Sequence, residues 1–154
     1  MDNVSRGVVG IITNNSYLNG ITHRKMRAEL LKEFDEIYVL NLHGNSRIGE
    51  TAPDGSPDQN VFDIQQGVGI TLFVKTGEKD NDEEGKVYYA DLYGSRSEKY
   101  RFLAHNDITT IDLKELNYRE FDSEFSRTRW GLSLIHISEP TRPLYISYAV
   151  FCLK

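Results

Sequence analysis

The stretch that decides the fold is residues 60–75, which read Asn60-Val61-Phe62-Asp63-Ile64-Gln65-Gln66-Gly67-Val68-Gly69-Ile70-Thr71-Leu72-Phe73-Val74-Lys75. Its first part is polar and predicts a loop. The part after Gln66 is a dense run of apolar and β-branched residues, which predicts a buried strand. Phe62 lies near this junction. Burial in the core is the default for a phenylalanine, but an aromatic at the end of a loop is also well placed to act on something outside the sheet.

Two strands and a helix are predicted before this stretch. Gly7–Thr13 is a short apolar run typical of a strand covered on both faces, and Glu36–Leu42 predicts a second strand. Between them, apolar residues recur at helical spacing, with Thr22 as the expected N-cap and Phe34 at the end. Strand, helix and strand in this order predict a βαβ unit.

After the stretch, residues 76–85 are charged and mostly acidic, which predicts an exposed connection. Lys86–Tyr93 is an aromatic-rich strand, and Tyr100–His105 predicts a short helix. The sequence predicts that Gln66–Lys75 and Lys86–Tyr93 form an antiparallel pair at the edge of the sheet. The predicted fold class is therefore α/β, with a strand-helix-strand unit followed by an antiparallel strand pair.

Polar residues follow the first predicted strand: Asn14, Asn15, Ser16 and Tyr17. In an open α/β sheet, ligands bind outside the carboxyl ends of the strands. These four residues would line a cleft if the strand is parallel to its neighbours. A polar turn that binds no ligand is an equally good interpretation.

Residues 43–59 form a long polar segment punctuated by glycine and proline, and such loops are usually functional or disordered. His43, at its start, titrates near neutral pH. No cysteine, second histidine or acidic residue lies around it at metal-ligand spacing, so a structural role is favoured over a metal-binding or catalytic one.

Composition limits the function classes. The 154 residues are 27% charged and 39% hydrophobic, as expected for one soluble domain or a piece of one. The N-terminus lacks the pattern of a secretory signal, and the one cysteine, Cys152, forms no internal disulfide; both features predict a cytoplasmic protein. The net charge of -5 argues against a free-standing DNA-binding module, because phosphate contacts need a basic face.

The character of the chain changes near residue 132. Residues 133–154 include Leu-Ile-His-Ile-Ser-Glu-Pro-Thr-Arg-Pro and Ile-Ser-Tyr-Ala-Val-Phe-Cys-Leu-Lys, which look like translated sequencing-adapter read-through. Residues 132–154 are therefore interpreted as a non-native tail and excluded from functional reasoning. The alternative is a genuine terminal strand at Leu144–Leu153, favoured by its β-branched and aromatic content.

Two segments within residues 5–103 carry a resemblance to a known family. Gly7–Leu18, with the helix that follows, resembles the strand-loop-helix after the catalytic motif of adenine-specific DNA methyltransferases, as found in single-chain, type I-like restriction-modification enzymes. Asn60–Lys75 resembles the later motif of that family, in which an aromatic precedes the last strand of a Rossmann-like sheet. The resemblance implies that Phe62 stacks on an adenine flipped out of double-stranded DNA.

The resemblance also implies what the chain lacks. In the family, an Asn/Asp-Pro-Pro-Tyr/Phe motif positions the adenine amine for methylation by S-adenosylmethionine, and a glycine-rich turn receives that cofactor. This chain contains no Pro-Pro pair, and its Gly67-Val68-Gly69 lies inside a predicted strand. Residues 1–131 are thus expected to be the C-terminal portion of the catalytic domain. The cofactor would be bound by an N-terminal part, with target-recognition, helicase and nuclease parts elsewhere in the polypeptide.

Other functions stay open. The missing motifs and the acidic charge favour a non-catalytic α/β interaction module of a restriction complex as the main alternative. A nucleotide hydrolase of the same fold class ranks last, because the chain has no phosphate-cradling lysine loop and no convincing pair of nucleophile and base.

Overall fold

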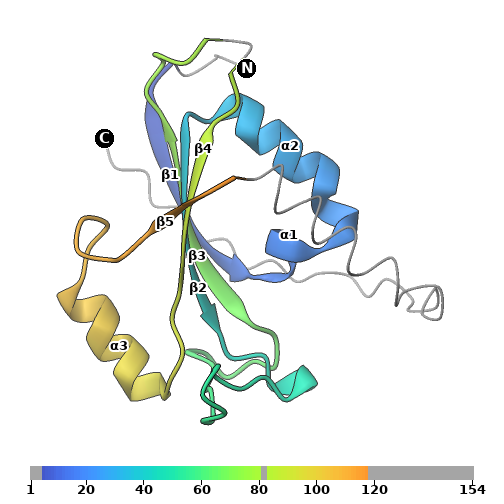
Figure 1. The fold of residues 1–154 in the computed structure, drawn as a ribbon, viewed down its shortest axis with the longest axis vertical. Coiled ribbons are helices and arrows are strands. Elements are labelled where there is room, and N and C mark those ends of the chain that lie inside the picture. The colour runs from blue at the N-terminus through green and yellow to red at the C-terminus, as the bar shows by residue number, and fades with distance from the viewer. Residues whose placement is uncertain (1–4, 81–82, 118–154) are drawn as a thin grey trace.

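The computed structural model describes residues 5–80 and 83–117, which form a mixed α/β unit around one open sheet (Figure 1). The five strands lie in the order β1-β3-β2-β4-β5. Their bounds are β1 Gly7–Asn14, β2 Glu36–His43, β3 Val68–Lys75, β4 Lys86–Asp91 and β5 Lys114–Leu116. The predicted tail at residues 132–154 and the domain boundary at 131 lie outside the described residues.

Strand β3 lies between β1 and β2 and is antiparallel to both. Strands β1 and β2 are therefore parallel to each other, as the predicted βαβ unit requires, but they do not pair directly. The apolar character of β3 on both faces follows from this central position.

The predicted antiparallel pair between Gln66–Lys75 and Lys86–Tyr93 is wrong. Strand β4 instead pairs in parallel with β2, from Glu36 opposite Lys86 to Asn41 opposite Asp91. The physical reason is that β1 and β2 occupy both hydrogen-bonding edges of β3. Strand β4 therefore cannot pair with β3 and adds to the outer edge of β2, and residues 76–85 connect β3 to it.

The prediction that Gly7–Thr13 is covered on both faces is also wrong. Within the described residues β1 is an edge strand, and Val8 and Val9 are 51% and 37% exposed. Its apolar content therefore reflects strand propensity and an incompletely covered surface rather than burial on both faces.

Helices cover the two faces of the sheet separately. The helices α1 (Ser16–Asn19) and α2 (Arg24–Glu33), joined by η1 (Ile21–His23), lie on one face, and α3 (Arg96–His105) lies on the other (Figure 1). The predicted N-cap Thr22 is wrong: His23 occupies that position and makes no side-chain capping bond. The predicted helix Tyr100–His105 begins earlier than expected, at Arg96, because Ser95 and Glu98 form a capping box at its N-terminus.

Each face has its own apolar cluster. On the α2 face, Leu31, Ile37, Val39 and Phe73 are buried together. On the α3 face, the buried residues are Leu40, Leu42, Val61 and Val68. Alternate residues of β2 thus serve opposite faces, as the two-residue period of a strand dictates.

The parallel strands β1, β2 and β4 end at the same edge of the sheet, here called the carboxyl edge. The segment between β2 and β3, residues 44–67, lies at this edge and includes η2 (Ser46–Ile48). It is here called the β2–β3 loop. No helix in residues 5–80 and 83–117 is long and apolar enough to cross a membrane.

Candidate functional site

The side chains of Val61 and Phe62 point to opposite environments in the β2–β3 loop. Val61 is 3% exposed and belongs to the apolar cluster under α3, whereas Phe62 is 43% exposed. The buried valine anchors the loop to the core at the position directly before the aromatic. The ring of Phe62 is therefore partly accessible to a ligand although its neighbour is fixed.

Asn60 braces this loop from within. Its Nδ2 donates to the carbonyl groups of Gly44, at 3.0 Å, and Gln66, at 2.6 Å, while its Oδ1 accepts from the Phe62 amide at 2.9 Å. Gly44 has φ 81°, and a Cβ there would lie 2.5 Å from the Cα of Asn60. Only glycine permits this close approach, which ties the start of the loop to its end.

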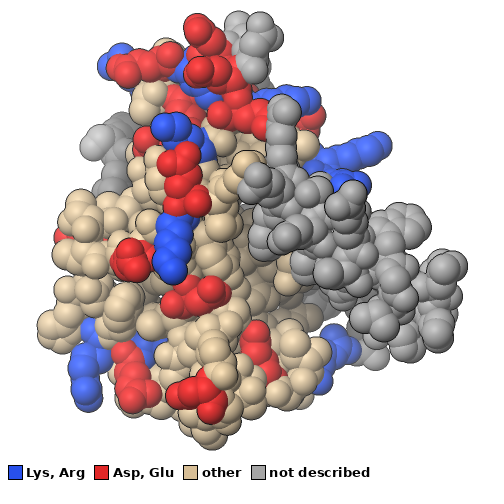
Figure 2. Space-filling model, viewed as in Figure 1, with Lys and Arg blue, Asp and Glu red and all other residues tan. Residues whose placement is uncertain are grey.

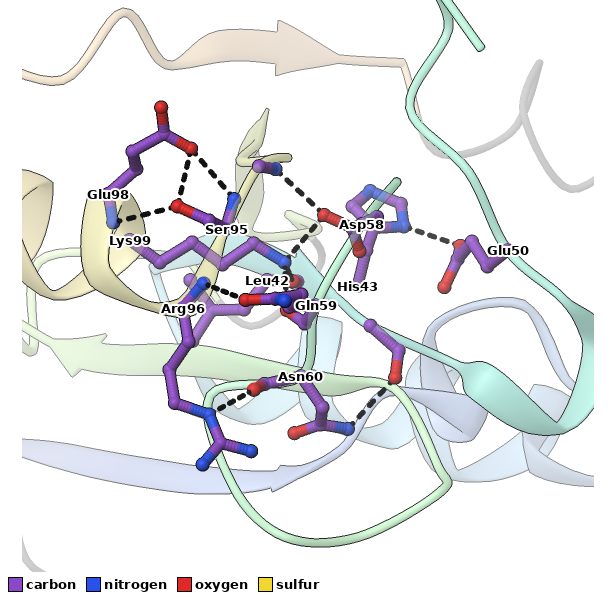
Figure 3. Close-up of polar contacts among 12 residues, drawn as sticks. Leu42, His43, Glu50, Asp58, Gln59, Asn60, Ser95, Arg96, Glu98 and Lys99 are labelled. Carbon is purple, nitrogen blue, oxygen red and sulfur yellow. Dashed lines mark hydrogen bonds and ion pairs between the residues drawn. The ribbon is translucent and has the colours of Figure 1, made fainter. Parts of the chain in front are cut away.

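Helix α3 holds the same segment from outside, as Figure 3 shows. The guanidinium of Arg96 donates from Nε to the Asn60 carbonyl, at 2.8 Å, and from Nη2 to the Phe62 carbonyl, at 3.1 Å. The hydroxyl of Tyr100 donates to the Val61 carbonyl at 2.5 Å. Three successive carbonyl groups of the loop are therefore bound by one helix.

Lys99 lies on the same helix as Arg96 and Tyr100, and its side chain is fully buried. Its Nζ is 2.7 Å from Oδ1 of Asp58 and donates to the carbonyls of Leu42 and Gln59, also at 2.7 Å (Figure 3). Asp58 Oδ1 also accepts from the Gly94 amide, whereas its Oδ2 is buried without a hydrogen-bond partner among the described residues. A buried charge of this kind is tolerated only because it is paired and hydrogen bonded.

His43 lies at the end of β2 with both ring nitrogens engaged. Its Nδ1 is 2.8 Å from Glu50 and its Nε2 is 2.6 Å from Asp91, and its ring stacks on Tyr93 with centroids 4.0 Å apart. Burial lowers the pKa of His43, but the hydrogen bonds to Asp91 and Glu50 and their charges raise it above its usual value overall. The ring is thus suited to link two carboxylates as an imidazolium.

The structural role favoured for His43 from sequence fits this geometry, although its two acidic partners lie seven and 48 positions away and could not be identified from spacing. No group of three or more histidine, cysteine or acidic residues in the described part of the chain is arranged to hold a metal ion. Burial raises the pKa of Asp91, yet hydrogen bonds from His43 and Tyr89 bring it below its usual value. Neither ring nitrogen of His43 is left to act as a base.

The predicted cleft residues Asn14 and Asn15 lie beside the end of the β2–β3 loop. Asn14 Nδ2 donates to Gln66 Oε1, at 2.6 Å, and its Oδ1 accepts from the Ser16 amide, at 2.7 Å. The Asn15 amide donates to the Gly67 carbonyl at 2.9 Å, and its side chain donates to Asn41. These groups bind other parts of the chain, and their contact with a ligand stays a prediction.

Tyr17 faces the sheet rather than the loop. Its hydroxyl is hydrogen bonded to Thr71, and burial raises the pKa of Tyr17 to about 12, an effect that the Thr71 bond partly offsets. The ring lines an apolar cavity of about 110 Å³ under α2 and a second cavity of about 240 Å³ against β1, which Asn14 and Ser16 also line. The Tyr17 hydroxyl is therefore unsuited to proton transfer near neutral pH.

Acidic and basic side chains are interspersed over the face drawn in Figure 2, with acidic groups gathered at the end where the β3–β4 connection lies. That connection contains Glu78, Asp80, Glu83 and Glu84. A phosphate backbone would be repelled from this end of the molecule.

The role of Phe62 as a base-stacking residue stays a prediction. The sequence did not indicate the residues that bind the backbone around it, namely Asn60, Arg96 and Tyr100, or the buried Lys99 of the same helix. Arg96 and Lys99 resemble ordinary exposed residues of a charged helix in the sequence. The one available signal was Lys99 itself, since it lies three residues before the apolar Phe102, on the face that packs against the sheet.

The fold and site together define a mixed α/β sheet whose carboxyl edge carries a braced loop with an outward aromatic. Neither a family model nor a curated protein sequence matches the chain. Solved structures do match. One is an ATP-dependent Type ISP restriction-modification enzyme, LlaBIII, bound to DNA, with 40% identity over 64% of this chain and a TM-score of 0.55.

Another is a nuclease-deletion mutant of the Type ISP enzyme LlaGI in complex with a DNA substrate mimic, with 28% identity over 74% of this chain and a TM-score of 0.61. A cryo-EM structure of a DrdV–DNA complex shares the fold, with 24% identity over 74% of the chain and a TM-score of 0.62. The chain spans only 6% of LlaBIII and 11% of the other two proteins. It is thus similar to a small part of two Type ISP restriction-modification enzymes and shares its fold with a small part of DrdV.

Proposed function

We propose that this chain is the C-terminal portion of the catalytic domain of an adenine-specific DNA methyltransferase in a restriction-modification system, and that Phe62 stacks on the flipped adenine. The observation that carries the proposal is the exposed ring of Phe62 on a loop whose backbone is fixed at residues 60, 61 and 62. The similarity to two Type ISP enzymes in complex with DNA or a DNA mimic supports the restriction-modification and DNA-binding parts.

The proposed role follows from the demands of the reaction. An enzyme that modifies a base amine must extrude the base from the duplex, and the lost stacking energy must be partly replaced. A ring carried on a backbone that is already fixed does this with less loss of conformational entropy on binding. The residues of this chain would hold and orient the base, and the chemistry needs no nucleophile from them.

The described residues do not fit the cofactor. Of the candidate glycine pair, Gly67 faces the Asn15 side chain, from which an added Cβ would lie 2.6 Å away. A Cβ added to Gly69 would be 3.7 Å from Leu18. This is not an open cradle for a ligand. S-adenosylmethionine, which supplies the methyl group in the proposed family, would have to be bound by another part of the enzyme, and the purified 154-residue chain is expected not to methylate DNA.

The proposal is tested in the methyltransferase that contains this segment, using a duplex with 2-aminopurine at the target position. Phe62→Ala should weaken binding of the extruded base by about 1 to 3 kcal/mol, because base–aromatic stacking is lost. Phe62→Leu, which keeps apolar volume but no ring, should lose nearly as much. Ile64→Ala is the matched control, since Ile64 lies in the same loop and is 48% exposed. Equal binding by all four proteins would refute the stacking role.

The second candidate is a non-catalytic interaction module of a restriction complex. It is favoured by the net charge of -5 and by the mixed charges of the face in Figure 2. The discriminating observation is the DNA upstream of the codon for Met1. An in-frame Asn-Pro-Pro-Tyr segment and glycine-rich turn support the methyltransferase, and an intact reading frame without them supports the module.

A further inference from the structure

We propose that Arg96 is a positioning residue that aims Phe62 at the extruded base. This inference rests on the proposed function of Phe62 and assigns a new role to helix α3. The residue does not touch the base; it acts through the backbone of the β2–β3 loop.

The guanidinium of Arg96 binds both sides of the Val61 residue. Its Nε donates to the carbonyl of Asn60 at 2.8 Å, and its Nη2 donates to the carbonyl of Phe62 at 3.1 Å. The same Nη2 is 2.8 Å from Oδ1 of Asp63. A planar guanidinium can hold several acceptors in one fixed arrangement, whereas an ammonium group is a single point charge.

The loop has few rotations left once these bonds are made. Tyr100 binds the intervening Val61 carbonyl, and Asn60 Oδ1 binds the Phe62 amide. The peptide groups before and after Phe62 are therefore both hydrogen bonded, so α3 and Asn60 together set the direction of its Cα–Cβ bond. Because Arg96 binds the carbonyl of Phe62 itself, its loss should leave the ring freer to turn away from the base.

The backbone of Arg96 is itself held in place by the helix cap and by contacts of α3 with the rest of the fold. Arg96 is the first residue of α3, directly after the Ser95 cap, and its own amide donates to Gln59 Oε1 at 2.9 Å. Three residues later, Lys99 anchors the helix to the sheet through the buried pair with Asp58. The Arg96 side chain is 40% exposed, so replacing it opens no cavity in the core.

The first test measures amide hydrogen exchange in the purified 154-residue chain. Arg96→Ala should speed the exchange of the amides of residues 60–64, on the order of tenfold or more at Phe62, and leave β2 and β3 unchanged. Arg96→Lys should give an intermediate increase, because lysine keeps the positive charge but lacks the planar guanidinium that binds two carbonyl groups at once. Arg101→Ala, on the same helix, is the control. Unchanged exchange in Arg96→Ala would overturn the inference whatever the function of the protein.

The second test is a double-mutant cycle in the methyltransferase, with binding of the 2-aminopurine duplex as the readout. Arg96→Ala alone should weaken binding by roughly tenfold, the scale of one or two charge-assisted hydrogen bonds. In the Phe62→Ala background the same change should cost less than about twofold, because the ring through which Arg96 acts is gone. Full additivity would mean that Arg96 contacts the DNA directly and would overturn positioning.

The two proposals fail in different ways. Faster exchange in Arg96→Ala, with equal base binding by the wild type and Phe62→Ala, supports the positioning of the loop and overturns the stacking function. Weaker base binding by Phe62→Ala, with no effect of Arg96→Ala, supports the stacking function and overturns positioning.

Discussion

The two faces of the sheet are stabilised by different interactions. On the α2 face, Leu31 and Phe73 belong to the buried apolar cluster, and the rings of Phe34 and Phe73 are 5.0 Å apart. The polar bonds there include those from Arg27 of α2 to the carbonyls of Tyr17 and Gly20. On the α3 face an apolar cluster of similar size is joined by the buried Lys99–Asp58 pair and by the bonds from Arg96 and Tyr100 to the loop.

The difference in interactions follows from the structure that each face holds: a regular helix on the α2 face, and a helix together with an irregular loop on the α3 face. Apolar burial is non-directional and is sufficient to hold a helix against a sheet. Hydrogen bonds depend on angle as well as distance, so they can fix the conformation of an irregular loop. On the α3 face, polar interactions from the helix fix the β2–β3 loop in one shape.

The largest expected effect is on the α3 face. Lys99→Met should lower the free energy of unfolding by about 4 kcal/mol, because it leaves Asp58 as a buried carboxylate without its partner. Urea denaturation measures this, and hydrogen exchange in residues 58–66 should speed up in the same variant.

The matched control for Lys99→Met is the double variant with Asp58→Asn. An amide at position 58 still accepts the bond from Gly94 but carries no charge, so stability should partly recover. A single variant within about 1 kcal/mol of the wild type would mean that the charged pair is not a major stabilising feature of this face.

A smaller effect is expected from the α2 face. Leu31→Ala should cost about 3 kcal/mol, since Leu31 is 3% exposed and its truncation leaves a cavity in a packed cluster. Urea denaturation gives the cost. Under conditions where both proteins are fully folded, the amides of residues 58–66 should exchange as fast in Leu31→Ala as in the wild type. Faster exchange confined to these residues would contradict the division of roles between the faces.

The smallest effect concerns pH and the carboxyl edge. The folded pKa of His43 is raised, so its stabilising contribution is complete below the unfolded value of about 6.5 and is lost as pH rises through the folded pKa. The folded pKa of Asp91 is lowered, so its contribution is complete above about pH 4 and is lost as pH falls through that lower value. Both contributions are therefore complete between about pH 4 and 6.5.

The test compares wild type with His43→Asn, because asparagine tolerates the φ of 51° at this position. The stability difference should be about 1 kcal/mol near pH 6 and shrink at higher pH, the size being limited because the Asp91 side chain is 41% exposed. Thermal denaturation across pH 5 to 9 measures it. A pH-independent difference would indicate that His43 stabilises only through its stacking on Tyr93.

The strands and helices were largely predictable, because the signals are local. The predicted strand Glu36–Leu42 is one residue shorter than β2, which ends at His43. The apolar run after Gln66 corresponds to β3. Pairing was not predictable in the same way. Nothing local in β4 indicates that its partner is β2 rather than β3, since the choice depends on which edges β1 has already left free.

In the candidate site, too, local features were predictable from the sequence and long-range contacts were not. Phe62 was predicted to be a site residue from its position near a loop-to-strand junction. Its exposure excludes full burial in the core, and its contact with a base stays a prediction. Besides Asn60, the groups that hold the loop around Phe62 come from α3, 34 to 39 positions later in the chain. No spacing rule connects Asn60 or Val61 to Arg96 and Tyr100 over that distance.

The sequence by itself determined the α/β class and the positions of most elements, because these depend on residue periodicity and on short-range propensity. Tertiary structure decided the strand order, the buried partners of Lys99 and His43, and the direction in which Phe62 points. These features depend on hydrogen bonds and charge pairs between residues far apart in the chain, and such bonds exist only once the fold has brought the residues together.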